Sequence, residues 1–321
     1  MKRIIGCFLV LLLVALGASP ALAELPGDFA DIDGHWAEQD IAAVSNLGLI
    51  TGIGDNDQGD NLFAPGASAS RAQLASTLQR ILELDYGKSP LPKQPVASDY
   101  YRDVDDSAWY AEAVMFCAIN QVFASGGNFY PEQEITRIEV ARTIYRGVNA
   151  KGLNIPMIML MPHYQDMQGL SQEDTNALVF VSNTGLMKGD SQYWRPNDKV
   201  TRAELAQVMH GLIKLIAVNQ GHNGQEYSLA PGQTLNLMLD SNPTTGYRWT
   251  AFYDEEMLAL VGKDYQTDNP SGDLVGAGGH DFWRFKALKA GTTEIRMTYA
   301  RPWESVQPLK TFTLKLTVAP D

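Results

Sequence analysis

Three short stretches in the last third of the sequence combine residue types that suit a binding surface. The first is a nearly uncharged turn between two alternating runs, in which proline fixes one φ angle, glycine permits a positive φ and asparagine can bond its own backbone. Two adjacent β-branched threonines stiffen its tip. The residues of this turn are Asn242, Pro243, Thr244, Thr245, Gly246 and Tyr247. The pattern predicts a short, rigid wedge between two strands.

The second stretch is a glycine-rich loop, and the third carries a tryptophan and an arginine where a polar loop is usual. The glycine loop precedes the predicted strand Asp281–Ala287 and contains Gly276, Gly278 and Gly279. The third stretch separates the last two predicted strands and contains Arg301, Pro302 and Trp303. Glycine allows close backbone approach to a partner, and tryptophan and arginine often dominate binding energy. A lone N-P-x-x-G is more simply an ordinary strand connection, but the three loops together favour a binding surface.

No group of residues in the sequence indicates catalysis. The five histidines are scattered, with no pair at metal-ligand spacing on one helix. The glycine-rich loop has no lysine and opens a strand rather than a helix, which argues against phosphate binding. The formal net charge of −12 argues against a nucleic-acid partner. We therefore expect no enzyme activity, no metal and no cofactor.

The elements that must hold the three loops are strands, because apolar and polar residues alternate around them. The alternating apolar positions are Leu235, Leu237 and Leu239, then Ile295, Met297 and Tyr299, then Phe312, Leu314, Leu316 and Val318. Short strands at this spacing predict an all-β sandwich.

In this order, the three loops resemble those of the chagasin family of cysteine-protease inhibitors. The resemblance covers Tyr227–Val318. It implies an immunoglobulin-like β-sandwich whose loops plug the active-site cleft of papain-family cysteine proteases. The loop residues named above would then be the protease-binding residues, with the wedge filling the cleft without bringing in a charge that must be desolvated.

An internal repeat occupies the sequence from Phe29 to Ile216. In each copy an arginine follows a proline by six residues, and the three arginines, Arg71, Arg137 and Arg202, are 66 and 65 residues apart. Each copy reads as helix, loop, helix. The second helix opens with a capping box in every copy, formed by Ser70 and Gln73, Thr136 and Glu139, and Thr201 and Glu204.

Each arginine directly follows the helix N-cap, where the helix dipole disfavours a cation. An anion bound at the helix start, shared by backbone N–H groups and the guanidinium, would explain this position. The alternative is that the arginines bridge to acidic residues of a neighbouring repeat and only hold the repeats together.

The sequences Ile135–Glu139 and Val200–Glu204 match the I-T-R-A-E signature of surface-layer homology (S-layer homology, SLH) repeats, and Ala69–Gln73 matches it loosely. The resemblance implies an all-α trefoil of three helix-loop-helix repeats whose grooves bind acidic, often pyruvylated, cell-wall polysaccharide. Gly52 and Gly189 lie in the glycine-containing loop of that family. With the three arginines, they are the predicted polymer-binding residues. The second repeat has a divergent loop, so not every groove need bind.

The predicted organisation is multidomain. Residues 1–23 form a secretory signal, with Lys2 and Arg3, an apolar core and an A-x-A site ending at Ala23. The remaining segments are a first repeat at 24–84, a linker at 85–98, a second repeat at 99–150, an insert and third repeat at 151–216, a linker at 217–226 and the sandwich at 227–321. No stretch is suited to spanning a membrane. Beyond the signal only Cys117 remains, which excludes an internal disulfide.

We interpret the sequence as a secreted, monomeric inhibitor of papain-like cysteine proteases that is attached to the bacterial cell wall or surface layer. The alternative is a structural or adhesive surface protein whose immunoglobulin-like domain has kept its fold but lost inhibition. The intact set of three loops favours the inhibitor.

Overall fold

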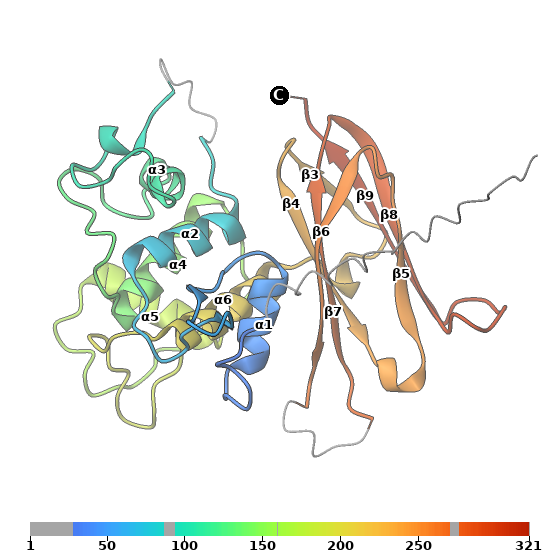
Figure 1. The fold of residues 1–321 in the computed structure, drawn as a ribbon, viewed down its shortest axis with the longest axis horizontal. Helices are drawn as coiled ribbons and strands as arrows, with labels where there is room; N and C mark the ends of the chain where they lie inside the picture. The colour runs from blue at the N-terminus through green and yellow to red at the C-terminus, as the bar shows by residue number, and fades with distance from the viewer. Residues whose placement is uncertain (1–27, 87–93, 159, 270–275, 321) are drawn as a thin grey trace, which may run out of the picture.

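The computed structural model describes residues 28–86, 94–158, 160–269 and 276–320. Figure 1 shows a helical region, formed by the first part of the chain, beside a β-sandwich formed by the last part. The predicted signal at residues 1–23 and residues 87–93 of the predicted first linker lie outside the described residues.

In the residues that the structure describes, the helical region consists of three units of two helices each. The units pair α1 (Glu38–Asn46) with α2 (Arg71–Leu82), α3 (Ala111–Ile119) with α4 (Arg137–Ala150), and α5 (Gln172–Asn183) with α6 (Arg202–Ile216). Two short strands, β1 (Gly54–Asp55) and β2 (Asn61–Leu62), and a 3-10 turn, η1 (Ala97–Asp99), lie between them. The predicted capping boxes at the starts of α2, α4 and α6 are confirmed, with both reciprocal hydrogen bonds present in each.

The three units close into a ring through backbone hydrogen bonds. The Ala69 N–H donates to the Val200 carbonyl at 2.8 Å, the Val200 N–H to the Ile135 carbonyl at 3.0 Å, and the Ile135 N–H to the Ala69 carbonyl at 3.0 Å. All three residues are buried, and each lies two positions before a repeat arginine. Each unit therefore contacts both others, in the threefold manner that the resemblance implied.

A second set of recurring contacts is made by one aspartate in each repeat. The turn before each repeat proline contains a non-glycine residue at φ of 57° to 59°, a conformation that L-residues disfavour. An aspartate carboxylate accepts two backbone N–H bonds from that turn. The pairs are Asp31 with Phe63 and Ala64, Asp103 with Phe129 and Tyr130, and Asp166 with Trp194 and Arg195.

The sandwich has two sheets, as the alternation predicted. One sheet has the order β3 (Glu226–Leu229), β9 (Lys310–Val318), β8 (Gly291–Ala300) and β5 (Arg248–Phe252), and the other β4 (Thr234–Ser241), β7 (Gly279–Ala287) and β6 (Leu258–Thr267). Only the β3–β9 pair among these strands is parallel. Two 3-10 turns, η2 (Gln220–His222) and η3 (Pro243–Thr245), precede β3 and β5.

The outer face of the β4–β7–β6 sheet packs against the helical region. On β7, Trp283 and Phe285 belong to the sandwich core, whereas Phe282, 1% exposed, belongs to the core of the helices. The Arg284 side chain donates to the Leu47 carbonyl at 3.0 Å and to the Arg80 carbonyl at 2.7 Å. A strand covered on both faces loses its polar alternation, which explains the nearly continuous burial of β7.

Candidate functional site

The predicted wedge is a single 3-10 turn, η3, tied down by Asn242. The Asn242 side-chain oxygen accepts from the Thr244 N–H at 3.2 Å and from the Thr244 hydroxyl at 2.6 Å, and its backbone carbonyl accepts from the Thr245 hydroxyl at 2.6 Å. Gly246 closes the turn at φ +83°, as its type required. Thr244 and Thr245 are exposed at the tip. The wedge is therefore preorganised by hydrogen bonds within it.

The loop that follows β8 packs directly against the wedge. The Arg301 Nε donates to the Thr245 carbonyl at 3.1 Å, and its guanidinium lies 4.6 Å from the centre of the Tyr247 ring. A Cβ at Gly246 would lie 2.6 Å from Trp303 Cη2, so glycine is needed there for the indole as well as for the turn. Trp303 is nevertheless 68% exposed. Pro302 is also exposed, so this loop presents an aromatic surface beside the wedge.

The glycine loop contacts the wedge from the other side. The Asn242 side-chain amide donates to the Gly276 carbonyl at 2.9 Å. Residues 270–275, which begin this connection, lie outside the described residues. Gly279 belongs to β7 rather than to the loop, and a side chain there would collide with the Gln266 carbonyl on β6. Its role is therefore close strand packing, while Gly276 and Gly278 remain in the loop.

Two residues that support the wedge were missed by the sequence analysis. The Tyr299 hydroxyl accepts from the Asn242 N–H at 2.7 Å, and the Tyr299 ring stacks on Tyr247 with centroids 5.4 Å apart. Glu304 accepts from Arg301 Nη1 at 2.9 Å and orients the guanidinium. The sequence predicted Tyr299 only as an apolar position of an alternating strand, because the spacing of residues gives no information about the contact of its hydroxyl group.

The backbone N–H groups at the three arginine helix starts already have protein partners. The arginine N–H groups at positions 71, 137 and 202 donate to the carbonyls of Gln133, Asp198 and Ala67, and the next N–H groups donate to those of Pro131, Pro196 and Pro65. The expectation that these N–H groups are open to an anion is therefore wrong. The neighbouring unit supplies the acceptors that a helix start needs.

The three guanidinium groups also reach into the neighbouring unit. Their Nε atoms donate to the carbonyls of Phe129, Trp194 and Phe63, at 2.8, 3.0 and 2.8 Å, and each group lies over the aromatic ring of the same residue. Arg202 is only 5% exposed, and burial lowers its pKa. Arg71 and Arg137 are half-buried. These contacts correspond to the alternative of arginines holding the units together, except that most of the acceptors are carbonyls rather than carboxylates.

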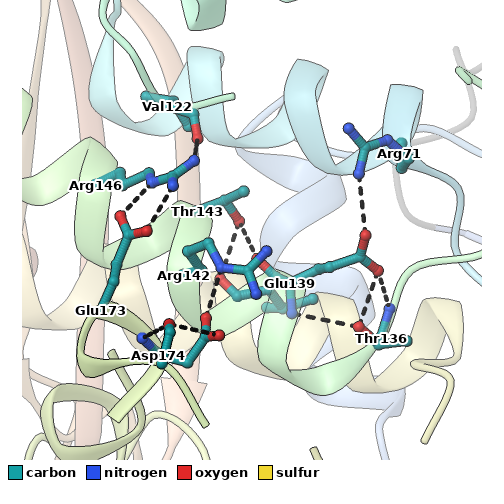
Figure 2. Close-up of polar contacts among 11 residues, drawn as sticks. Arg71, Val122, Thr136, Glu139, Arg142, Thr143, Arg146, Glu173 and Asp174 are labelled. Atoms are coloured by element: carbon teal, nitrogen blue, oxygen red, sulfur yellow. Dashed lines mark hydrogen bonds and ion pairs between the residues drawn. The ribbon is translucent and has the colours of Figure 1, made fainter. Parts of the chain in front are cut away.

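Arg71 differs from the other two arginines in its second contact. Arg202 Nη2 donates to the Thr51 carbonyl at 2.9 Å and Arg137 Nη2 to the Lys188 carbonyl at 2.8 Å, each directly before a loop glycine. Arg71 instead pairs with the Glu139 carboxylate at 3.0 Å. Figure 2 shows this carboxylate also receiving the Thr136 N–H, so it serves the capping box and the arginine together. The divergent loop of the second unit accompanies this change.

Further ion pairs join the second and third units. The Arg146 guanidinium donates to both carboxylate oxygens of Glu173 and holds the pKa of that carboxyl below its usual range. Arg142 donates to Asp174 at 2.6 Å (Figure 2). These pairs lie between α4 and α5, so the contact between these units is partly electrostatic.

The two loop glycines are packing residues in their units. A side chain at Gly52 would lie 2.7 Å from the Leu62 carbonyl and from the Phe29 ring, and one at Gly189 would collide with the Tyr193 carbonyl. The glycines therefore let each loop approach its own unit closely. Their predicted contact with a polymer stays a prediction.

Within the residues that the structure describes, no three His, Cys, Asp or Glu side chains are arranged to hold a metal ion. In the same part of the chain, no helix has the length and apolar character that crossing a membrane requires. Cys117 is buried, and burial raises the pKa of its thiol. A buried, protonated thiol is a poor nucleophile.

Comparisons with known proteins assign both regions. The family model for S-layer homology domains matches residues 28–75 and 100–141, which lie in the first two units. S-layer protein EA1 of Bacillus anthracis is 31% identical over 209 residues, which cover 64% of this chain and 22% of that protein. The chain spans 26% of a second relative, an S-layer protein of Bacillus licheniformis, and is 29% identical to it. The chain thus carries S-layer homology repeats, which indicate attachment at the cell surface.

The model for the chagasin family of peptidase inhibitors (I42) matches residues 228–318. Chagasin of Trypanosoma cruzi is 35% identical over 92 residues, which cover 27% of this chain and 81% of that protein. A crystal structure of the cysteine protease inhibitor EhICP2 from Entamoeba histolytica is 27% identical, covers 32% of this chain and 93% of its own, and gives a TM-score of 0.30. Through its sandwich, this chain belongs to the chagasin family of peptidase inhibitors, which are not enzymes.

Proposed function

We propose that this chain inhibits papain-like cysteine proteases at a bacterial cell surface. The observation that carries the proposal is the convergence of three loops at one end of the sandwich, joined through Asn242, Gly246 and Arg301. Membership of a family of peptidase inhibitors supports the choice of target class. The S-layer homology repeats would hold the inhibitor at the cell wall.

The wedge has the properties that a cleft-filling loop needs. Its turn is already closed by hydrogen bonds from Asn242, so little conformational entropy is lost on binding. Its tip residues, Thr244 and Thr245, are exposed and uncharged. They bring no charge that must be desolvated beside the cysteine thiolate and histidine of a papain-type enzyme. The wedge therefore fills the cleft at small cost.

The loop after β8 supplies the second part of the binding surface. One edge of the Trp303 indole packs on Gly246, and the remainder of this side chain is exposed. An exposed tryptophan is the kind of side chain that often dominates protein–protein affinity. Arg301 is held by Glu304 and by the wedge carbonyl, so it too is oriented before binding.

The test is a titration of papain with the chain lacking the predicted signal. We expect reversible inhibition, without cleavage of the chain. Thr245→Asp places an unpaired carboxylate in the cleft, which should cost about 3 kcal/mol or more. Thr292→Asp is the matched control, because Thr292 is exposed near the start of β8, whereas the inhibitory loop follows the end of that strand.

A folded chain that leaves papain and related enzymes fully active at micromolar concentration would contradict the proposal. It would favour a structural role for the sandwich. Equal effects of Thr245→Asp and Thr292→Asp would show that inhibition does not use the wedge.

The anchoring part of the proposal concerns an acidic, often pyruvylated, cell-wall polysaccharide. Of the predicted polymer-binding residues, Arg71 and Arg137 are partly exposed and could contact the polymer directly. Arg202 is buried and would act through the Thr51 carbonyl that it holds beside Gly52. Gly189 has the same place beside the Lys188 carbonyl in the third unit.

Sedimentation with cell-wall sacculi tests the anchoring. The chain should pellet with sacculi that carry their acidic polymer and not with sacculi stripped of it. Replacing Arg71 and Arg137 together by alanine should weaken pelleting. The control is the double alanine variant of Arg248 and Arg296, two exposed arginines of the sandwich. If both double variants pellet as the parent does, the repeat arginines are not polymer ligands.

A further inference from the structure

The first S-layer homology unit lies next to the glycine loop of the inhibitor. Strand β6 ends at Thr267, and the next residue, Asp268, donates its N–H to the Gly278 carbonyl at 2.9 Å. Thr267 and Asp268 line a cavity of about 700 Å³ together with Trp36, His35 and Lys214 of the helical region. One wall of this cavity is therefore the base of an inhibitory loop, and the other wall is the beginning of α1.

Trp36 stands exposed at this cavity, and the backbone beside it is fixed. It is 60% exposed, whereas Ala37 beside it is completely buried. The His35 ring lies 5.4 Å from the Trp36 ring, and His35 Nδ1 accepts from the Ala37 N–H at 3.1 Å. Aromatic side chains are enriched at protein interfaces, so an exposed tryptophan beside a cavity suits a binding surface.

Contacts between the helical region and the sandwich fix the position of Trp36 relative to the inhibitory loops. Asn46 at the end of α1 donates to Asp264 on β6 at 3.0 Å. His210 on α6 lies between Asp40 and Gln266, with its Nδ1 2.6 Å from the Asp40 carboxylate and 3.1 Å from the Gln266 amide. In Figure 1 the start of α1 lies at the same lower end of the molecule as η3.

The charges around the cavity indicate what it can accept. Three carboxylates, Glu38, Asp40 and Asp268, line it with a single ammonium group, Lys214. This balance repels an acidic polysaccharide and suits a neutral or basic protein segment. A protease seated on the three loops would lie near Asp268, because the Asp268 N–H is bonded to the Gly278 carbonyl of the glycine loop.

We propose that Trp36 and this cavity form a fourth contact with the protease that the three loops hold, and that they receive a neutral or basic segment of its surface. The inference rests on the proposed inhibition. It makes the anchoring region part of the inhibitory surface, so that target choice depends on both regions of the chain. Inhibitors of this family without the helical region would lack the contact.

The test compares Trp36→Ala with Trp109→Ala in the chain lacking the predicted signal, with papain as the probe. Trp109 is the equivalent tryptophan of the second unit and is 63% exposed, so it is a matched control. We expect Trp36→Ala to weaken inhibition about tenfold and Trp109→Ala to leave it unchanged. Gln39→Arg, which adds a positive charge to the cavity, should also weaken inhibition.

The outcomes separate this inference from the proposed function. If the parent inhibits papain and Trp303→Ala impairs it, but Trp36→Ala behaves as Trp109→Ala does, the fourth contact is wrong and the proposed function stands. If the parent does not inhibit, both are wrong. If Trp36→Ala lowers pelleting with wall sacculi without changing inhibition, and Gln39→Arg raises pelleting, the occupant is the wall polymer and the inference is overturned.

Discussion

Trp303, at the loop end of the sandwich, and Arg202, at the start of α6, are both held in well-defined local structure, yet the first is 68% exposed and the second 5%. In the sandwich, predicted binding residues such as Trp303 are exposed on loops that hydrogen bonds hold together. In the helical region they turn inward, onto the carbonyls and rings of the next unit.

This difference in exposure arises because the helical region is built from repeats and the sandwich is not. A residue that recurs once per repeat occupies the same place at every junction between units, so repetition alone selects packing contacts as readily as binding contacts. The three loops of the sandwich are not copies of one another, and their only common feature is the end of the sandwich where they meet. Convergence without repetition is therefore the better sign of a recognition surface in this chain.

The largest effect that this comparison predicts is on stability, at Arg202. Arg202→Ala removes charged hydrogen bonds to the Phe63 and Thr51 carbonyls, which should destabilise the chain by about 3 kcal/mol. Arg71→Ala should cost about 1 kcal/mol, because its side chain is partly exposed and its carboxylate partner can be solvated. Urea unfolding measures both. An Arg202→Ala chain that unfolds as the parent does but fails to pellet with sacculi would reverse the comparison.

The second effect is on inhibition, at Trp303. Trp303→Ala should weaken inhibition of papain by about 2 kcal/mol, or roughly 30-fold, because it removes a central interface aromatic. Its unfolding midpoint should stay that of the parent, since the side chain is largely exposed. Val306→Ala, in the same loop and 65% exposed, is the control and should change neither property. A large loss of stability in Trp303→Ala would mean that the indole is a packing residue.

A smaller effect is expected below the wedge, at Tyr299. Tyr299→Phe leaves the Asn242 N–H without its acceptor, which should weaken inhibition by about 1 kcal/mol while the sandwich stays folded. Hydrogen exchange of the Asn242 amide should become faster in the variant. Unchanged exchange and inhibition would show that the wedge is held by its internal bonds alone.

The smallest effect is a pH dependence at the contact between the two regions. Burial lowers the pKa of His210 below its ordinary value of 6.5, so the unfolded chain binds a proton at a pH where the folded chain does not. Stability should therefore fall as the pH drops below 6.5. The groups that face His210 are Asp40, Lys214, Asp264 and Gln266. Burial raises the pKa of Asp264, which contributes the opposite slope.

His210→Gln isolates the histidine contribution. The variant should lose the fall in stability between pH 7 and pH 5.5, measured by urea unfolding, while the contribution of Asp264 remains. An identical pH profile in the parent and His210→Gln would contradict the assignment.

Much of the local structure could be predicted from the sequence. The capping boxes at Ser70, Thr136 and Thr201 use side chains only three residues apart, so spacing alone reveals them. The alternation of Leu235, Leu237 and Leu239 gave both the strand and its buried face. These features depend on short-range geometry, which the sequence pattern records directly.

The partners of the arginines and the contact between the two regions could not be predicted. Arg202 and Arg284 donate to backbone carbonyls far along the chain, and a carbonyl acceptor leaves no trace in residue type. Phe282 read as part of an ordinary strand, although its side chain joins the core of the helices. Only the three-dimensional structure identifies backbone acceptors far along the chain and strands that are buried on both faces.

The ring formed by Ala69, Ile135 and Val200 also constrains the order of events during synthesis. Its last member is the most C-terminal of the three, and Arg202 joins Phe63 across 139 residues. Closing contacts of such separation costs chain entropy and slows folding. The ring and the contact of Arg202 with the first unit therefore form only once the third unit is available. The sandwich closes later still, because β3 pairs with β9, which ends only at Val318.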